Sequence, residues 1–224
     1  MKKRIVIIGG RGTAVVIAEQ IQDAIDRFKY DAEILGFAID DPAYGGSING
    51  YPIVAGVRDA YPKYKKEQDI FFIYSLYRPD VMKDRIDILN SLSIPHDRFL
   101  NFIHPTCTVS KSSLMGYGNI VLANTVINPN VKLGHHNTIN SNCLIGHDSE
   151  IGDNNFLAGH VCVGSNIKIG NGNFIGLNSG LRNMINIGNY CLIGMCSNVT
   201  KSYDEQTLYG NPASPRALSG KPVR

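Results

Sequence analysis

The sequence predicts two consecutive domains, a small α/β domain with a parallel sheet and a β-solenoid built from triangular coils. Over residues 1–98, strand-like apolar runs alternate with segments whose apolar residues recur at helical spacing, which is typical of an α/β domain. Over residues 99–200, an aliphatic residue or methionine recurs at every sixth position, which is typical of stacked coils. Residues 201–224 lack this period and are predicted to form a C-terminal cap.

The N-terminal domain is expected to begin with a strand, a glycine turn and a helix. Residues 4–8 read Arg-Ile-Val-Ile-Ile, the turn Gly9-Gly10-Arg11-Gly12 follows, and residues 13–28 carry apolar side chains at helical spacing. This alternation predicts a small Rossmann-like domain. Further strands are predicted over residues 32–39 and 69–74, and a second helix over residues 80–92.

The second domain is predicted from its six-residue period. Stepping by six from Ile103 to Val199, no polar residue interrupts the series. Three such segments make one coil, so residues 18 apart should stack as parallel strands, with their aliphatic side chains along the axis. One expected stack contains Ile127, Ile145, Val163 and Leu181. Glycine follows the repeated residue at positions 116, 134, 146, 152, 164, 170, 176, 188 and 194.

Composition argues against several classes of function. The 22 basic and 19 acidic side chains are spread along the chain, so no basic block indicates nucleic acid or a membrane surface as a partner. No apolar run approaches the roughly 18 residues that a membrane span needs, and the first residues do not resemble a signal peptide, so we expect a cytoplasmic protein. The five cysteines lack zinc-type spacing, so neither a disulfide nor a metal site is expected.

Hexapeptide repeats of this kind resemble those of the left-handed β-helix acyltransferases, over residues 103–215. The whole chain resembles the sugar acetyltransferases of the bacillosamine, perosamine and sialic-acid O-acetyltransferase group. The resemblance implies a left-handed parallel β-helix, a homotrimer, acetyl-CoA between adjacent β-helices, and a nucleotide-linked amino sugar that bridges the two domains. Three further segments carry the match: Asp40-Asp41, Ile145-Gly146-His147-Asp148 and Gly210-Asn211-Pro212-Ala213.

Acetyl transfer from a thioester to an amine needs a base for the amine proton and stabilisation of the oxyanion. The resemblance assigns the base to His147, its polarising acidic neighbour to Asp148, and an acceptor contact to Asn140. The residues alone also fit a plainer interpretation. His147 and Asp148 are then polar side chains on a solvated corner, and Asn140 belongs to a stacked asparagine ladder.

Three other histidines compete for the role of base. His135 and His136 lie two coil edges before His147, and His160 occupies a position where relatives vary. Relatives often place a cofactor-contacting histidine where this chain has Phe156, so His160 is predicted to contact acetyl-CoA in its stead. The remaining predicted cofactor contacts are Gly164 and Ser165, whose backbone N–H groups either bind the thioester carbonyl or serve ordinary strand pairing, and Pro212 and Ala213.

The glycine turn of the first domain is a weak dinucleotide fingerprint. A GxGxxG pattern begun at Gly10 has Val15 in its third glycine position, so NAD is not expected. A turn that opens a helix still offers N–H groups and a dipole to a phosphate. The predicted nucleotide-sugar contacts are Gly10, Arg11, Gly12, Thr13, Asp40 and Asp41, although relatives have a histidine at the position of Thr13.

These features favour an acetyl-CoA-dependent N-acetyltransferase that acts on a UDP-, TDP- or GDP-linked 4-amino-deoxysugar in surface polysaccharide synthesis. O-acetylation of a sugar such as sialic acid, and a non-catalytic β-helix scaffold, are the alternatives. A γ-carbonic anhydrase-like zinc enzyme would need converging histidines, but no two of the six are 18 residues apart. The six are His96, His104, His135, His136, His147 and His160.

Overall fold

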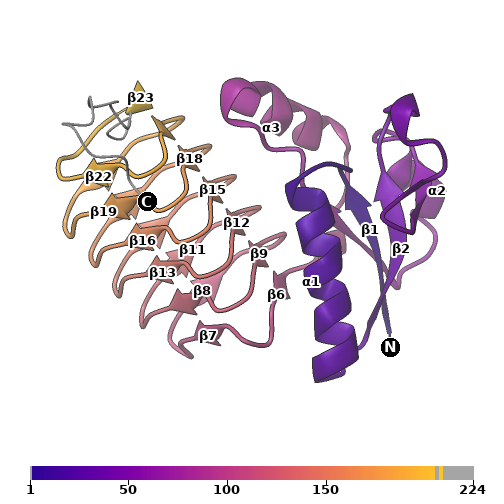
Figure 1. The fold of residues 1–224 in the computed structure, drawn as a ribbon, viewed down its shortest axis with the longest axis horizontal. Helices are drawn as coiled ribbons and strands as arrows, with labels where there is room; N and C mark the ends of the chain where they lie inside the picture. Colours follow the sequence, from indigo (N-terminus) through magenta and orange to yellow (C-terminus); the bar gives the residue numbers. More distant parts are fainter. Residues whose placement is uncertain (1, 205–206, 209–224) are drawn as a thin grey trace, which may run out of the picture.

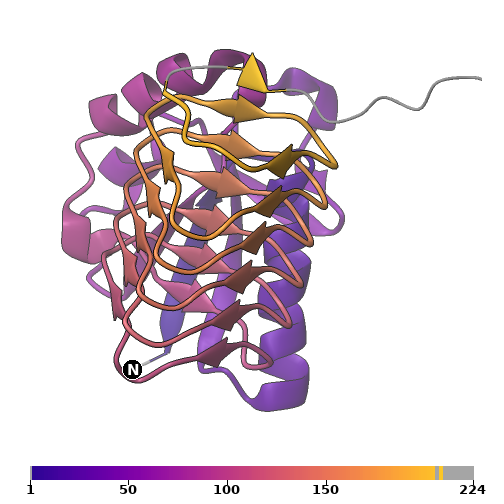
Figure 2. The ribbon, with the colours of Figure 1, turned by 90° about the vertical axis from the view of Figure 1, so that its left-hand side faces the viewer.

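The computed structural model describes residues 2–204 and 207–208. Its coils stack along one axis, and the N-terminal domain lies against one face of the stack (Figure 1). In a view turned by 90°, the coils lie in front of that domain (Figure 2). The predicted combination of an α/β domain and a left-handed parallel β-helix is confirmed. Within the described residues, no helix has the length and apolar character that crossing a bilayer requires.

The N-terminal sheet has the strand order β3-β4-β2-β1-β5. The predicted strands correspond to β1 (Lys3–Ile8), β2 (Ala32–Ala38) and β5 (Ile70–Tyr74). The sequence prediction missed β3 (Ser47–Ile48) and β4 (Tyr51–Ala55), an antiparallel pair that makes the sheet mixed rather than parallel. These strands are short and β4 contains a proline, so neither shows a clear period of two. The helices are α1 (Thr13–Phe28), α2 (Ala60–Tyr64) and α3 (Met82–Ser91), and 3₁₀ turns span Pro42–Tyr44, Pro79–Val81 and His96–Arg98.

The β-helix has three sheets, which we number in chain order. The predicted 18-residue stacking is confirmed, since Ile127, Ile145, Val163 and Leu181 pair in parallel register. The first sheet contains β6 (Phe102–Ile103), β9 (Ile120–Val121), β12 (Thr138–Ile139), β15 (Phe156–Leu157), β18 (Phe174–Ile175), β21 (Leu192–Ile193) and β23 (Thr207–Leu208). The second contains β7 (Thr108–Val109), β10 (Val126–Ile127), β13 (Leu144–Ile145), β16 (Cys162–Val163), β19 (Gly180–Leu181) and β22 (Asn198–Val199). The third contains β8 (Leu114–Met115), β11 (Lys132–Leu133), β14 (Glu150–Ile151), β17 (Lys168–Ile169) and β20 (Asn186–Ile187).

Three corners join the sheets, and each is named here by where it lies. The open corner joins the second and third sheets and includes residues 146–149. The covered corner joins the third and first sheets and includes residues 134–137, and the side corner joins the first and second sheets and includes residues 140–143. Most coils place a residue with positive φ at the same position of each corner. Asparagine often fills this position because it tolerates the left-handed conformation.

The first sheet and its two corners meet the N-terminal domain. Helix α1 lies between the N-terminal sheet and the first sheet of the β-helix (Figure 1), and its Ile17 and Ile21 share one apolar core with Phe102 and Ile120. At the covered corner, the Tyr77 hydroxyl donates to the carbonyl of His136, 3.1 Å away, and hydrogen-bonds Asn154. Burial raises the pKa of Tyr77 well above its usual value, so the hydroxyl keeps the proton that it donates.

Part of the C-terminal segment continues the stack. Tyr203 forms a bridge to Ile187, and β23 pairs with β21. The Ser202 hydroxyl accepts the Asn186 N–H at 2.9 Å. These contacts add a partial coil beyond the last aliphatic residue of the repeat, at the position predicted for the cap.

Candidate active site

His147 and Asp148 form a hydrogen-bonded pair on the open corner. The imidazole Nδ1 lies 2.7 Å from Asp148 Oδ2, and Asn130 of the preceding coil donates to Asp148 Oδ1 at 2.9 Å. Gly146 allows the close approach of the next coil, because a Cβ there would lie 2.4 Å from the Gly164 carbonyl carbon. The side chains of His147 and Asp148 are 54% and 45% exposed, so a second molecule can reach both.

The charge on Asp148 fixes the chemistry of the pair. The hydrogen bond from His147, and then that from Asn130, lowers the pKa of Asp148 below its ordinary value. An ionised carboxylate beside Nδ1 holds the proton on that nitrogen, which leaves the lone pair on Nε2. Within the described residues, no side chain hydrogen-bonds Nε2 of His147. The arrangement is that of an imidazole base oriented by a carboxylate.

Gly164 and Ser165 lie one coil beyond Gly146 and His147. The Gly164 N–H donates to the carbonyl of Leu181 at 2.9 Å, and the Ser165 N–H donates to Asn183 Oδ1 at 3.0 Å. Both donors that sequence analysis offered to the thioester carbonyl are therefore engaged within the chain. A cofactor contact at these two residues stays a prediction.

Asn140 and His160 lie on the side corner, a different edge of the β-helix from His147. The Asn140 amide donates to the carbonyl of Leu157 at 3.0 Å, and the residues 18 positions away from it are Leu122 and Ala158, so it is not part of an asparagine ladder. His160 Nε2 lies 3.4 Å from the Asn142 amide. One chain thus does not bring either residue to His147. Phe156 stacks on Phe174 in the interface with α3, so this position packs the two domains together.

His135 and His136 occupy the covered corner. Tyr117 stacks on His135 with ring centroids 3.9 Å apart, and Phe99 meets His136 edge to face at 4.4 Å. Burial, reinforced by the nearby His135 and His96, lowers the pKa of His136 from 6.5 to about 4. His136 is therefore neutral at pH 7 and lies beneath other rings, which makes it a poor base for an external substrate.

A cavity of about 440 Å³ opens at the carboxyl end of the N-terminal sheet. Of the residues predicted there, Gly10, Arg11, Asp40 and Asp41 line it, whereas Gly12 and Thr13 begin α1 outside the lining. Arg11 forms an ion pair with Asp41. Its guanidinium also lies 5.2 Å from the centroid of the Tyr44 ring. This edge is where open α/β sheets bind their ligands.

Sequence analysis missed the other wall of this cavity. Ser75, Tyr77 and Arg78 follow β5, and Arg85 comes from α3. Their signal in the sequence was their place after the carboxyl end of a predicted strand. The Pro212 and Ala213 predictions lie outside the described residues.

The cavity and His147 lie on different sides of one chain. The N-terminal domain packs on the first sheet (Figure 1), whereas the open corner joins the two other sheets. One chain therefore brings together His147 and Asp148, and separately Gly10, Arg11, Asp40 and Asp41, but it does not unite the two groups.

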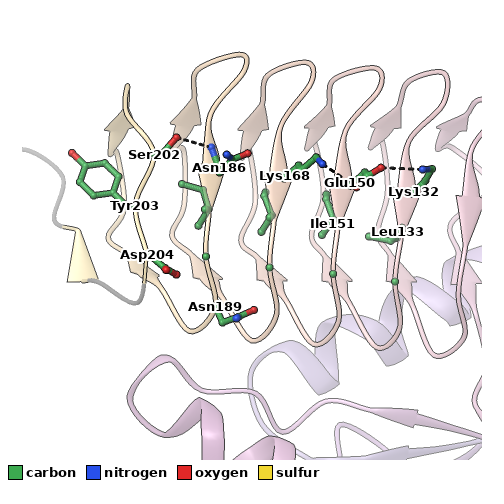
Figure 3. Close-up of a pocket in the computed structure, with 16 residues that line it drawn as sticks. Lys132, Leu133, Glu150, Ile151, Lys168, Asn186, Asn189, Ser202, Tyr203 and Asp204 are labelled. Carbon is green, nitrogen blue, oxygen red and sulfur yellow. Dashed lines mark hydrogen bonds and ion pairs between the residues drawn. The ribbon is translucent and has the colours of Figure 1, made fainter.

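A groove of about 780 Å³ crosses the third sheet, and sequence analysis did not predict it. Figure 3 shows Lys132, Glu150 and Lys168 along one side, with Glu150 between the two lysines. Glycines 134, 152, 170 and 188 line the groove. The open corner leads directly into this sheet, so Glu150 of the groove lies three residues after His147. Among the described residues, no three His, Cys, Asp or Glu side chains are grouped so as to hold a metal ion.

Comparison with solved structures finds the same architecture. The acetyltransferase domain of PglB from Neisseria gonorrhoeae, in complex with acetyl coenzyme A, matches with a TM-score of 0.78 at 22% identity over 96% of this chain and 100% of that one. A histidine-to-asparagine mutant of perosamine N-acetyltransferase from Caulobacter crescentus, in complex with CoA and GDP-perosamine, matches with a TM-score of 0.76 at 22% identity, over 95% and 96%. WeeI from Acinetobacter baumannii matches with a TM-score of 0.74 at 23% identity, over 95% and 99%.

The fold is shared along the whole chain. Both domains and their order are those of the three solved proteins. No protein-family model matches the sequence, and no curated protein matches it. Because a shared fold does not fix an activity, the activity has to follow from the residues of the site.

Proposed function

We propose that this chain is an acetyl-CoA-dependent N-acetyltransferase that acts on a nucleotide-linked amino sugar. The observation that carries the proposal is the His147–Asp148 pair, which is exposed on the open corner and in which the carboxylate engages Nδ1. The proposal is supported by the shared fold, since one solved neighbour is an acetyltransferase domain with acetyl coenzyme A and another is a perosamine N-acetyltransferase with CoA and GDP-perosamine.

In the proposed reaction, the amine nitrogen of the sugar attacks the thioester carbon of acetyl-CoA. A C–N bond forms, the carbonyl oxygen takes up negative charge, and His147 Nε2 accepts the proton that the amine loses. The C–S bond then breaks, and the CoA thiolate leaves with the proton returned by His147. Asp148 acts through His147, because its carboxylate holds the Nδ1 proton and stabilises the imidazolium that forms.

The N-terminal cavity is the proposed site for the nucleotide. Its turn at Gly10 and Arg11 precedes the 16-residue helix α1, whose N-terminus favours phosphate. Asp40 and Asp41 stand beside the turn, where carboxylates accept hydrogen bonds from a base or ribose. A nucleotide cavity favours a carrier-linked 4-amino-deoxysugar over the O-acetylation alternative, because a free sugar has no need of it. We assign the chain to surface polysaccharide synthesis in the cytoplasm, where the nucleotide sugars are made.

We propose that the active form is a homotrimer. A nucleotide held in the cavity of one copy lies on the far side of the β-helix from its own His147, so the sugar must reach His147 of a neighbour. The groove beside the open corner gives acetyl-CoA a binding place between two copies. Lys132 and Lys168 flank this groove and are proposed to pair with the phosphates of acetyl-CoA. Light scattering with activity measurement tests the assembly, and a fully active monomer would overturn it.

The activity itself is tested by incubating the protein with acetyl-CoA and a panel of UDP-, TDP- and GDP-linked amino sugars. Product should be followed by mass, since exposed Cys162 and Cys196 would react with thiol reagents that detect free CoA. We expect a gain of one acetyl group on one member of the panel, and raised thermal stability with its nucleotide. Acetylation of a free sugar hydroxyl, with no nucleotide binding, would instead support the O-acetyltransferase.

A further inference from the structure

Among the residues that the structure describes, one arginine of the N-terminal cavity has no counter-ion. Four arginines line it, and three are occupied on the surface: Arg11 pairs with Asp41, Arg78 with Asp80, and Arg58 hydrogen-bonds Ser91. The fourth, Arg85, is the least exposed of them. Within the described residues, no carboxylate lies within ion-pair distance of its guanidinium, and its Nε is buried without a hydrogen-bond partner.

The fold fixes where this guanidinium stands. Arg85 is the fourth residue of α3, and its carbonyl accepts a hydrogen bond from the Tyr74 hydroxyl at the end of β5. In the sheet order, β1 lies between β2 and β5. The carboxyl edge of the sheet therefore presents Asp40 and Asp41 on one side of the Gly10 turn, and Arg85 on the other.

Burying the Nε donor without an acceptor is costly, since this N–H has lost water and gained nothing in exchange. The guanidinium that carries it lines a cavity that also borders a helix N-terminus, and the group that pairs with a cation in such a place is an anion. Arginine suits phosphate in particular, because its planar fork of donors matches two phosphate oxygens.

We propose that Arg85 binds the second phosphate of a nucleoside diphosphate and thereby selects diphosphate over monophosphate ligands. The nucleoside then lies toward Asp40 and Asp41, the first phosphate lies over the Gly10 turn, and the second phosphate lies against Arg85. The sugar leaves the cavity on the α3 side. This inference rests on the proposed nucleotide-sugar function and deepens it by assigning the direction of the ligand.

The test compares the affinities of the diphosphate and the monophosphate in the full-length protein. Isothermal titration calorimetry is run with UDP and UMP, GDP and GMP, and TDP and TMP. For the pair that binds, we expect the wild-type protein to prefer the diphosphate on the order of tenfold to a hundredfold, as a charge-assisted phosphate contact gives. In Arg85→Gln this preference should fall to about one, while monophosphate affinity changes less than about threefold.

Two further variants guard against a trivial result. Arg85→Lys keeps the charge without the fork and should retain part of the preference for the diphosphate. Arg27→Gln is the matched control, because Arg27 is an exposed α1 arginine paired with Asp23 and should leave the preference unchanged. Melting temperatures establish that each variant is folded.

The outcomes separate this proposal from the proposed function. If the wild-type protein acetylates a nucleotide sugar but Arg85→Gln keeps the preference for the diphosphate, the role of Arg85 is wrong and the function stands. If no acetylation occurs but the preference collapses in Arg85→Gln, the role of Arg85 stands without that function. Absence of binding for all six nucleotides would overturn both.

Discussion

Two corners of the β-helix carry the same local structure and different chemistry. His135 and His147 each follow an aliphatic residue and a glycine of the repeat. The next residues, His136 and Asp148, have φ values of 55° and 57°. The covered corner is packed beneath Tyr117 and the N-terminal domain, whereas the open corner faces solvent.

The difference shows that the repeat sets the backbone and that domain packing sets which histidines stay accessible. At the covered corner, His136 is 8% exposed and its carbonyl accepts a hydrogen bond from the Tyr77 hydroxyl, so His136 contributes to the domain interface. At the open corner, the equivalent position is a carboxylate that orients an accessible imidazole. A histidine is thus a candidate base here only where no other domain covers its corner.

The largest expected difference between the corners is in catalysis. Loss of a general base reduces the rate on the order of 10² to 10⁴, so His147→Asn should lower kcat/KM by that factor while acetyl-CoA still binds. His135→Asn is the matched control from the covered corner and should change kcat/KM less than about threefold. Near-normal turnover of His147→Asn across the pH range would show that another group removes the proton.

The covered corner should make the free energy of unfolding depend on pH in the acidic range. The pKa of His136 is lowered from 6.5 to about 4 in the folded chain, so the unfolded chain binds the proton first as the pH falls. The contribution of neutral His136 to the free energy of unfolding is complete above pH about 6.5. It is lost progressively as the pH falls from about 6.5 to about 4, by on the order of 3 kcal/mol in all. His136→Asn, which suits the positive φ, should abolish that part of the loss.

Urea unfolding at several pH values between 7.5 and 4 measures this difference. Asn154→Ala, which removes a Tyr77 contact at the same corner without a titrating group, is the control and should keep the wild-type pH dependence. If the free energy of unfolding fell with pH by the same amount in the wild-type protein and in His136→Asn, the role of His136 in this pH dependence would be contradicted.

A smaller effect is expected from the acidic partner at the open corner. Asp148→Asn retains the backbone conformation but removes the charge that holds the Nδ1 proton of His147. Loss of such a partner typically costs about tenfold to a hundredfold, so kcat should fall with little change in KM for acetyl-CoA. Asn130→Ala, which removes one hydrogen bond to Asp148, should cost less than Asp148→Asn. Equal activity of Asp148→Asn and wild type would reduce Asp148 to a surface residue.

The sequence was informative wherever a period or a turn repeated. The six-residue series predicted every strand from Phe102 to Val199, and the apolar spacing predicted α1 over Thr13–Phe28. The predicted asparagine ladder at Asn140 was wrong, because its stacked neighbours are Leu122 and Ala158, and its predicted contact with the acceptor stays a prediction.

The rest depended on contacts that local pattern does not contain. Which corner the N-terminal domain covers is set by long-range packing of Ile17, Ile21 and Ile120, and no repeat position records it. Arg85 escaped notice because its role depends on the distance in space between α3 and the Gly10 turn. The same limit hid the separation of His147 from the N-terminal cavity.

The direct test of a site shared between copies is complementation between two inactive variants. His147→Asn keeps the N-terminal cavity, and the double variant Asp40→Asn/Asp41→Asn keeps the open corner. The two variants are co-expressed with different tags and purified as mixed trimers. A trimer with two copies of one variant and one copy of the other, in either combination, contains one intact cavity that pairs with an intact His147 of a neighbour. The mixed trimers should therefore recover about one third of wild-type activity if the site spans two copies. Activity no higher than that of the separate variants would show that each copy works alone and would contradict the shared site.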